Sequence, residues 1–190
     1  DYDAVNGDLY YYAIAAYDFN SNESELSYDV VYAIARPEGF NEIIFDFLEF
    51  ENTSGYGFEE YSVLPYNDEG TDMFFENYEG TFWINVWADT EIQDMGETED
   101  IYDITEAPVS GWVPLIEDEN VKYVEVEIGH TYVVSTNRNH YAKFRVTEIT
   151  GQRLIFDWAF QLIPGETLLK LGSRNGKVKV NRTMVIKHTK

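Results

Sequence analysis

The chain has 190 residues, with 13 Lys or Arg and 35 Asp or Glu, so its formal net charge at pH 7 is −22. A surface this negative repels phosphate backbones and anionic lipids, which excludes nucleic acid and membrane surfaces as expected partners. A content of 44% hydrophobic and 16% aromatic residues predicts a folded core, the absence of cysteine excludes disulfides and thiol chemistry, and no apolar run approaches the roughly 20 residues of a membrane span.

Two runs near the N-terminus are rich in Tyr, Val and Ile and predict β-strands at residues 8–18 and 28–36. The turn-forming cluster Asn20-Ser21-Asn22 lies between them. Pro37-Glu38-Gly39 follows the second run and is the best candidate for a domain boundary. Residue 1 is Asp rather than Met, so we expect a processed product or a fragment of a longer chain.

The central part of the chain shows the period-2 alternation of β-strands, and helical periodicity is nearly absent. Strands are predicted at residues 42–50, 81–89, 124–135, 140–149 and 153–162. The last three are joined by turn-forming residues and predict a three-strand meander. One face of the final strand holds Leu154, Phe156, Trp158, Phe160 and Leu162. The acidic stretch from Asp89 to Asp103 is expected to be a loop, with one short helix after Thr98.

These patterns predict an all-β chain of antiparallel β-sandwiches, with helix limited to a turn or two. We expect three parts: partial strands at 1–38, an acidic all-β domain at 39–169 and a basic strand or tail at 170–190. The last part holds seven basic and no acidic residues, a charge of +7, which leaves −29 for residues 1–169.

The basic segment has β character between residues 177 and 187, where β-branched residues alternate with lysines. Gly172 and Gly176 flank a turn-like Ser-Arg-Asn just before it, so the strand can separate from the preceding domain. Three interpretations stay open: a last strand of the chain's own sheet, a disordered tail, or a strand donated to an acidic neighbouring subunit. The donor residues in the last case are Lys177, Val178, Lys179, Val180, Arg182, Met184, Val185, Ile186 and Lys187.

The first N-terminal run reads Tyr10-Tyr11-Tyr12-Ala13-Ile14-Ala15-Ala16-Tyr17-Asp18, and the second extends from Val30 to Ala35. Residues 7–36 thereby resemble the last two strands of a fibronectin type III domain, with Tyr10 at the position of the tyrosine corner. The resemblance implies an immunoglobulin-like sandwich, which needs about 100 residues. Two strands alone present an apolar face and an open edge, so we expect them to accept the donated strand. The expected acceptor residues are Tyr10, Tyr12, Ile14, Val30, Tyr32 and Ile34.

A second pattern lies in residues 125–162, in the runs Gly129-His130-Thr131-Tyr132-Val133-Val134, Asn139-His140-Tyr141-Ala142-Lys143-Phe144-Arg145-Val146 and Phe156-Asp157-Trp158-Ala159-Phe160-Gln161. These runs resemble a C-terminal β-domain that recurs in secreted bacterial proteins, often after fibronectin-like modules. They are also loosely similar to the all-β haem-binding proteins of the HmuY type. The resemblance implies an all-β fold and an extracellular or cell-surface location, and it brings no established activity.

No constellation of residues in the chain indicates catalysis, so we expect no enzyme and no cofactor. His130 and His140 are predicted to lie roughly five residues apart along the sheet, which favours structural or surface roles over metal or haem ligation. No Ser-His-Asp grouping, phosphate-binding loop or His-Glu-x-x-His motif is present. Calcium is the one candidate ion, because it prefers carboxylate oxygens, and the alternative is a solvated acidic loop. The weak candidate ligands are Asp94, Glu99, Asp100 and Asp103.

The predicted strand at 81–89 has two chemically different faces, one with Phe82, Ile84, Val86 and Ala88 and one with Trp83, Asn85, Trp87 and Asp89. Trp rings stack on the apolar faces of sugars, and amides and carboxylates bind sugar hydroxyls. The second face therefore predicts a glycan-binding site, unless both faces of the strand are buried in a sandwich.

Two functions from different classes follow. The first is a non-enzymatic extracellular structural protein, a subunit of a surface assembly or filament held by strand donation, and hence a homo-oligomer or polymer. The alternative is a secreted carbohydrate-binding accessory module that uses Trp83 and Trp87. The exposure of these two Trp side chains and the place of the C-terminal strand discriminate between them.

Overall fold

The computed structural model describes residues 4–28 and 31–169. Their strands are β1 (Leu9–Tyr12), β2 (Val31–Ile34), β3 (Glu38–Phe45), β4 (Gly55–Gly57), β5 (Ser62–Leu64), β6 (Met73–Tyr78), β7 (Thr81–Trp87), β8 (Glu91–Glu97), β9 (Val121–Glu125), β10 (His130–Ser135), β11 (Tyr141–Thr150) and β12 (Arg153–Phe160). The one helical element among the described residues is the short 3₁₀ turn η1 (Glu51–Thr53). The predicted all-β fold with antiparallel pairing is therefore confirmed.

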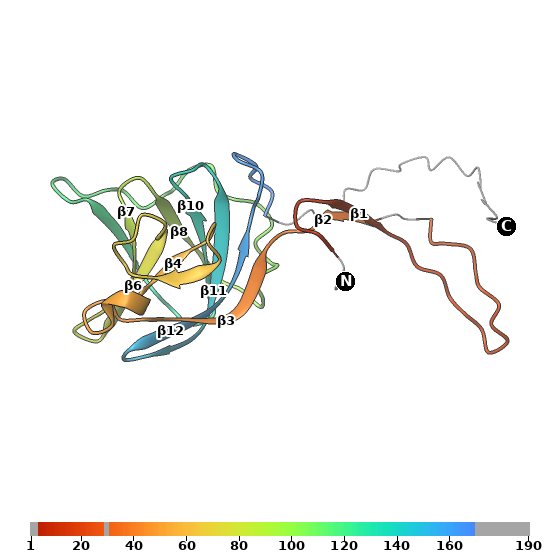
Figure 1. Ribbon diagram of the computed structural model, residues 1–190, viewed down its shortest axis with the longest axis horizontal. Helices are drawn as coiled ribbons and strands as arrows, with labels where there is room; N and C mark the ends of the chain where they lie inside the picture. The colour runs from red at the N-terminus through yellow and green to blue at the C-terminus, as the bar shows by residue number, and fades with distance from the viewer. Residues whose placement is uncertain (1–3, 29–30, 170–190) are drawn as a thin grey trace.

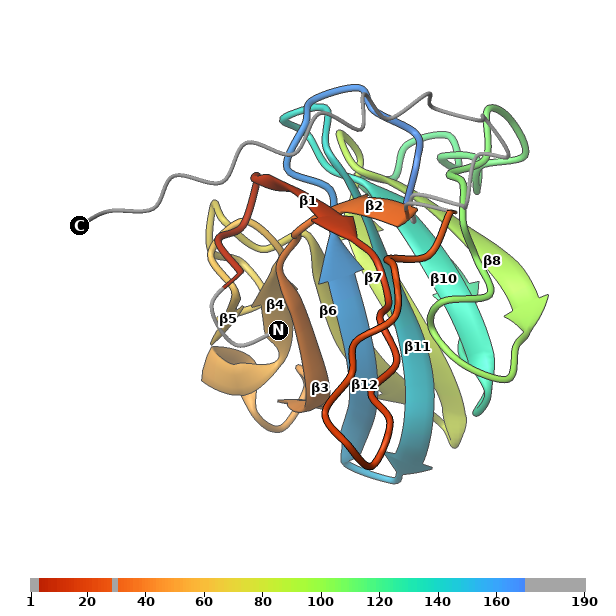
Figure 2. The ribbon, with the colours of Figure 1, turned by 90° about the vertical axis from the view of Figure 1, so that its right-hand side faces the viewer.

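The body of the molecule, residues 37–169, is built from two five-stranded sheets that pack face to face (Figure 1). One sheet has the order β3-β12-β11-β10-β8, as Figure 2 shows from left to right, and the other has the order β5-β4-β6-β7-β9. The strands β1 and β2 form a separate two-stranded sheet that lies beyond one end of the body (Figure 1). We call residues 4–35 the hairpin.

The core lies between the two large sheets, as the alternation of their sequences predicts. On β12, Leu154, Phe156, Trp158 and Phe160 are buried, and Leu162 packs against the same cluster. On β7, Ile84 and Val86 are fully buried from the opposite side. Aromatic rings join the two sheets, since Tyr56 of β4 contacts Phe156 at 5.3 Å and Trp158 at 5.6 Å between ring centroids.

The meander predicted near the end of the chain is present as β10, β11 and β12, with consecutive antiparallel pairing. Its first strand is shorter than predicted, because residues 121–125 form β9 in the other sheet and the chain crosses between the sheets at 126–129. Gly129 has a φ of +88° in this crossing, a conformation that favours glycine. Residues 124–135 are therefore two strands rather than one.

The acidic stretch from Asp89 to Asp103 is not a loop throughout, and this prediction is wrong. Residues 91–97 form β8, an edge strand that pairs with β10. Ile92 enters the core, and the carboxylates of Glu91 and Asp94 on this edge strand pair with Lys122 and His130. The predicted helix after Thr98 is also absent from this described stretch, where the Asp103 carboxylate accepts the Glu99 N–H at 2.7 Å within a turn.

The strand predicted at 42–50 begins and ends earlier, as β3. Glu38 starts its pairing opposite Ala159 of β12, and Gly39 follows opposite Trp158, where a Cβ at position 39 would overlap the indole ring. The strand ends before Asp46, whose buried carboxylate accepts N–H groups of Leu48 and Asn77 and so turns the chain toward β4. Within the part of the chain that the structure describes, no helix has the length and apolar character of a membrane span.

Candidate functional site

The hairpin is held together by a short ladder between β1 and β2. Leu9 pairs with Ile34 and Tyr12 pairs with Val31. Beyond the ladder, the Ser27 and Ser24 hydroxyls accept the backbone N–H groups of Ile14 and Ala16, at 3.2 and 2.9 Å. Side chains therefore continue the hydrogen bonding where the regular ladder stops, and the two arms extend well away from the body (Figure 1).

The tip of the hairpin is organised by Asp18. Its carboxylate accepts N–H groups of Asn20 and Asn22 at 2.8 and 2.9 Å, and Ser21 adopts a left-handed conformation with a φ of +65°. Hydrogen bonds from the Asn22 side chain and from the Asn22 and Asn20 backbones lower the pKa of Asp18. The turn predicted at Asn20-Ser21-Asn22 is thus confirmed.

The Tyr10 hydroxyl bonds back to the chain that precedes β1. It accepts the backbone N–H of Val5, five residues upstream, at 2.7 Å. The bond fixes the N-terminal approach to β1.

The hairpin exposes an unusual amount of apolar surface for its size. Ile14 is 77% exposed, Tyr17 is 68% exposed and Phe19 is fully exposed. Leu9, Tyr11, Tyr12, Leu26, Tyr28 and Val31 are exposed as well. Single exposed apolar side chains are ordinary on a protein surface, but so many of them on one two-stranded element favour an interaction site.

The expected acceptor residues fall on this element. Tyr10, Tyr12 and Ile14 lie on the first arm, and Tyr32 and Ile34 lie in β2, where Tyr32 pairs with Tyr11. Val30 lies outside the described residues. So does the whole donor segment: Lys177, Val178, Lys179, Val180, Arg182, Met184, Val185, Ile186 and Lys187.

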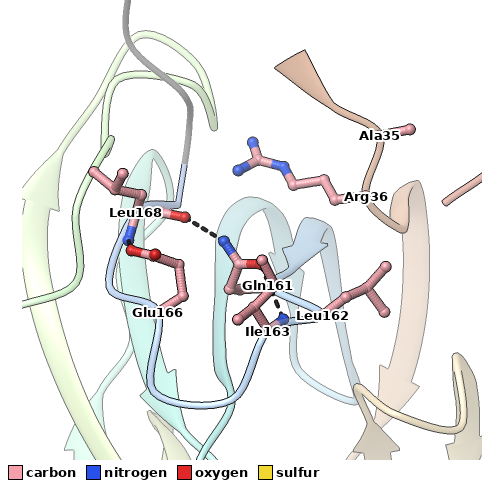
Figure 3. A pocket seen from close by; sticks show the side chains of 7 residues that line it. All are labelled: Ala35, Arg36, Gln161, Leu162, Ile163, Glu166 and Leu168. Atoms are coloured by element: carbon pink, nitrogen blue, oxygen red, sulfur yellow. Dashed lines mark hydrogen bonds between the residues drawn. The ribbon is translucent and has the colours of Figure 1, made fainter. Parts of the chain in front are cut away.

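A small pocket marks the joint between the hairpin and the body (Figure 3). Ala35 and Arg36 line one side and the loop 161–168 lines the other, where the Leu168 N–H donates to Glu166 Oε1 at 3.1 Å. Its volume of about 50 Å³ admits a few water molecules but no sugar or nucleotide. Burial lowers the pKa of the Arg36 guanidinium, and nearby Glu38 and Tyr102 oppose this shift.

The second candidate site is the outward face of β7. Trp83, Asn85 and Trp87 share this face, as the alternation predicts. Both Trp side chains are half-buried, whereas Asn85 is buried, with 4% exposed. Part of the face is covered, because Phe47 and Tyr66 pack on Phe74 beside Asn85. Trp83 meets Tyr123 of β9 edge to face at a centroid distance of 5.5 Å, and Asn85 Nδ2 donates to Glu76 Oε2 at 3.2 Å.

Trp87 lies at the end of β7, where the face turns into a depression. Its ring packs on Phe74, and its Nε1 donates to the Tyr66 carbonyl oxygen at 3.3 Å. Asp89, the fourth predicted glycan ligand, is exposed in the turn after β7 and lines the same depression. Trp87 and Asp89 are therefore brought together, while Trp83 and Asn85 lie further along the strand.

The histidines occupy separate structural positions. His130 Nδ1 lies 3.0 Å from an Asp94 carboxylate oxygen, and His140 Nδ1 lies 2.9 Å from the Gln161 carbonyl oxygen. His188 lies outside the described residues.

The four calcium candidates do not converge on one point. Asp94 contacts His130 and the Gly96 N–H, whereas Asp100 and Asp103 accept backbone N–H groups within the 99–103 turn. Glu99 donates its own N–H to Asp103. Among the described residues, no group of three or more His, Cys, Asp or Glu side chains is arranged to hold a metal ion.

Next to the depression lies the buried carboxylate of Asp72, whose pKa is raised. Asp72 accepts the Phe58 N–H at 2.8 Å and is 7% exposed. Burial, together with the nearby Glu60 and Glu59, raises the pKa of Asp72 to about 7, against the opposing effects of the Phe58 hydrogen bond and Arg138. Arg138 Nη1 reaches Glu59 Oε2 at 2.6 Å across this group.

Sequence reasoning missed Glu76 and Tyr123, which complete the outward face of β7. The signal for Glu76 is the alternation of Phe74, Glu76 and Tyr78 in β6, but that for Tyr123 requires knowing that β9 pairs with β7. No protein-family model matches the chain, and no curated protein matches it.

Proposed function

We propose that this chain is a non-enzymatic extracellular structural protein whose hairpin accepts a β-strand from another subunit. The observation that carries the proposal is the hairpin itself, a two-stranded sheet to which no third described strand is added. A two-stranded hairpin is marginally stable on its own, and its open edges are templates for pairing. An added strand would satisfy backbone groups and cover the exposed Ile14 and Tyr17 side chains.

The proposed donor is the segment 177–187 of a second copy. Residues 4–35 contain five carboxylates and no Lys or Arg, whereas 170–190 contain seven basic residues and no acidic ones. Opposite charges on donor and acceptor speed the encounter and disfavour pairing between two hairpins. Burying the apolar side chains of the donor contributes on the order of 1.5–3 kcal/mol for each large residue.

The geometry of such an exchange leads to a chain of subunits. A donor and an acceptor on the same molecule make a heterologous contact, which closes into a ring or continues as a filament. The extracellular location is part of the proposal, and it is supported by the resemblance of residues 125–162 to domains of secreted bacterial proteins.

The test compares the mass of the purified chain with that of a variant lacking residues 172–190, by light scattering across a concentration series. The full chain is expected to assemble, and the truncated chain is expected to stay a folded monomer. Charge reversal at Lys177, Lys179 and Arg182 should slow assembly more than it weakens the final contact.

Arg153→Glu is the matched control for charge reversal, because Arg153 lies on the body, where its guanidinium pairs with Glu148. This variant should assemble like the parent chain. Assembly of the truncated variant to the same mass as the parent would refute strand donation. So would a structure of the assembly in which residues 177–187 pair only within their own chain.

A further inference from the structure

Four loops at the Trp87 end of the body surround a wide depression. They come from the β5–β6 connection, the β7–β8 turn, the approach to β9 and the β10–β11 turn. The depression has a volume of about 680 Å³, within the roughly 300–1,000 Å³ of ligand sites. Its lining residues are Asn67, Asp68, Glu69, Thr71, Trp87, Ala88, Asp89, Thr90, Asn120, Asn137 and Arg138.

The wall of this depression combines one large aromatic ring with many polar groups. The Trp87 indole is held in place by its contacts with Phe74 and the Tyr66 carbonyl, so it offers a rigid apolar surface. Around it, no hydrogen bond to another described residue engages the side chains of Asn67, Asp89, Asn120 and Asn137. Three amides and a carboxylate are thus free to donate and accept toward a ligand.

The charges of the depression disfavour anionic ligands. Three carboxylates, those of Asp68, Glu69 and Asp89, face one guanidinium, that of Arg138. Arg138 is already paired with Glu59 and Glu60, so it offers little to an anionic ligand. Phosphate-bearing ligands are repelled by this balance, whereas an uncharged polyhydroxylated ligand meets both acceptors and donors.

The outward face of β7 extends the same chemistry beyond the depression. Trp83 lies four residues before Trp87 on the same face, roughly 13 Å away at the rise of a strand. Between them Asn85 is buried and bonds Glu76, so it offers no contact to a ligand, and Tyr123 stands edge-on to Trp83. The two half-buried Trp rings are therefore separate contact points along one line rather than one platform.

We propose that the body binds a neutral oligosaccharide, with one sugar ring on Trp87 in the depression and the chain of sugars running along β7 to Trp83. Trp87 provides the apolar contact, and Asp89, Asn120 and Asn137 bind hydroxyl groups. The site uses none of the hairpin residues, so it is independent of strand exchange.

The full-length chain is titrated with cellohexaose, xylohexaose and maltohexaose. Binding is measured by isothermal titration calorimetry and by the change in tryptophan fluorescence. At least one hexasaccharide is expected to bind, and the corresponding disaccharide is expected to bind more weakly because it cannot reach Trp83. Trp87→Ala should weaken the hexasaccharide by at least about tenfold, as the loss of a central aromatic contact does. Trp83→Ala should weaken the hexasaccharide but leave the disaccharide unchanged.

Trp112→Ala is the matched control, since Trp112 stacks on Tyr141 away from the depression, and it should leave binding unchanged. If Trp87→Ala lowers the melting temperature, the double variant Asn120→Ala/Asn137→Ala tests the binding site instead. Both Asn side chains are exposed, so their loss should weaken binding without unfolding the body. Absence of binding by all three hexasaccharides overturns the proposal. Binding that survives both the Trp87 and the double Asn variants also overturns it, as does preferential binding of a lysine-rich peptide in the depression.

Discussion

The hairpin and the body share one feature of residue composition, but their apolar side chains differ in burial. Both are rich in aromatic and β-branched residues, yet Tyr56 and Phe144 of the body are fully buried while Tyr17 and Phe19 of the hairpin are exposed. The difference lies in the number of strands, because two five-stranded sheets can cover each other and a two-stranded sheet covers nothing. β-forming sequence alone therefore does not guarantee a core, because two strands have too few neighbours to cover their own apolar side chains.

The largest expected effect separates the two regions by stability. Phe144 touches Tyr132, Phe58 and Phe156, so Phe144→Ala should lower the free energy of unfolding of the body by about 3–5 kcal/mol. Tyr11→Ala, at an exposed hairpin position, should change it by less than about 0.5 kcal/mol. Urea denaturation followed by tryptophan fluorescence measures both, since the four Trp residues all lie in the body. An equal loss in the two variants would make the hairpin part of the body's cooperative unit.

The second prediction concerns pH and again distinguishes the regions. The folded pKa of Asp72 is about 7, above its ordinary value of 3.8, so the folded state holds a proton that the unfolded state releases. The stability of the body should therefore fall as the pH rises from about 4 to about 7, and stay lower above that. Asp72→Asn should remove this fall and stabilise the body at pH 8 by roughly 1–3 kcal/mol.

Asp18 in the hairpin is the control, because its pKa is shifted in the opposite direction. The hydrogen bonds of its carboxylate are present above the ordinary pKa and are lost as the pH falls through the lowered one. Asp18→Asn should leave the unfolding of the body unchanged at every pH. Thermal melts of the parent chain, Asp72→Asn and Asp18→Asn between pH 4 and pH 8 test this prediction. If Asp72→Asn keeps the pH profile of the parent chain, Asp72 is not the source of the pH dependence.

The smallest expected effect lies within the hairpin. Tyr10→Phe removes the hydroxyl that accepts the Val5 N–H, so amide exchange at Val5 should accelerate several-fold. The melting temperature of the body should not change. Tyr12→Phe is the matched control, and the same acceleration in both variants would show that the Tyr10 hydroxyl does not hold the N-terminal approach.

The sequence predicts a strand correctly where apolar and polar residues alternate regularly. It fails where a segment becomes a strand only because another strand pairs with it. The faces of β7 and β12 follow from their own residues, because Ile84 and Phe156 alternate with polar or half-buried neighbours. β8 is not predicted from the sequence, because Glu91, Gln93 and Glu97 are residues typical of loops. They are in a strand because β10 pairs with them. The same distinction holds for the candidate site, of which one part can be predicted from a single strand and the other part cannot.

Trp83, Asn85 and Trp87 can be placed on one face from a single strand, and the structure agrees. The depression cannot be predicted, because Asn67, Asn120 and Asn137 come together only through the arrangement of both sheets. Local periodicity defines which way a side chain faces, and only the tertiary fold defines which distant loops it meets.

The joint in Figure 3 has a mechanical consequence for any filament built on the hairpin. Arg36 and Leu168 line the same small pocket, so the chain enters the body and reaches its last described residues at one corner. Glu38 at the start of β3 pairs with Ala159 near the end of β12, so the pulled ends of both strands lie at that corner. Tension applied between these two points would therefore open the β3–β12 ladder from this end, one hydrogen bond after another, rather than shear the two strands along their whole length.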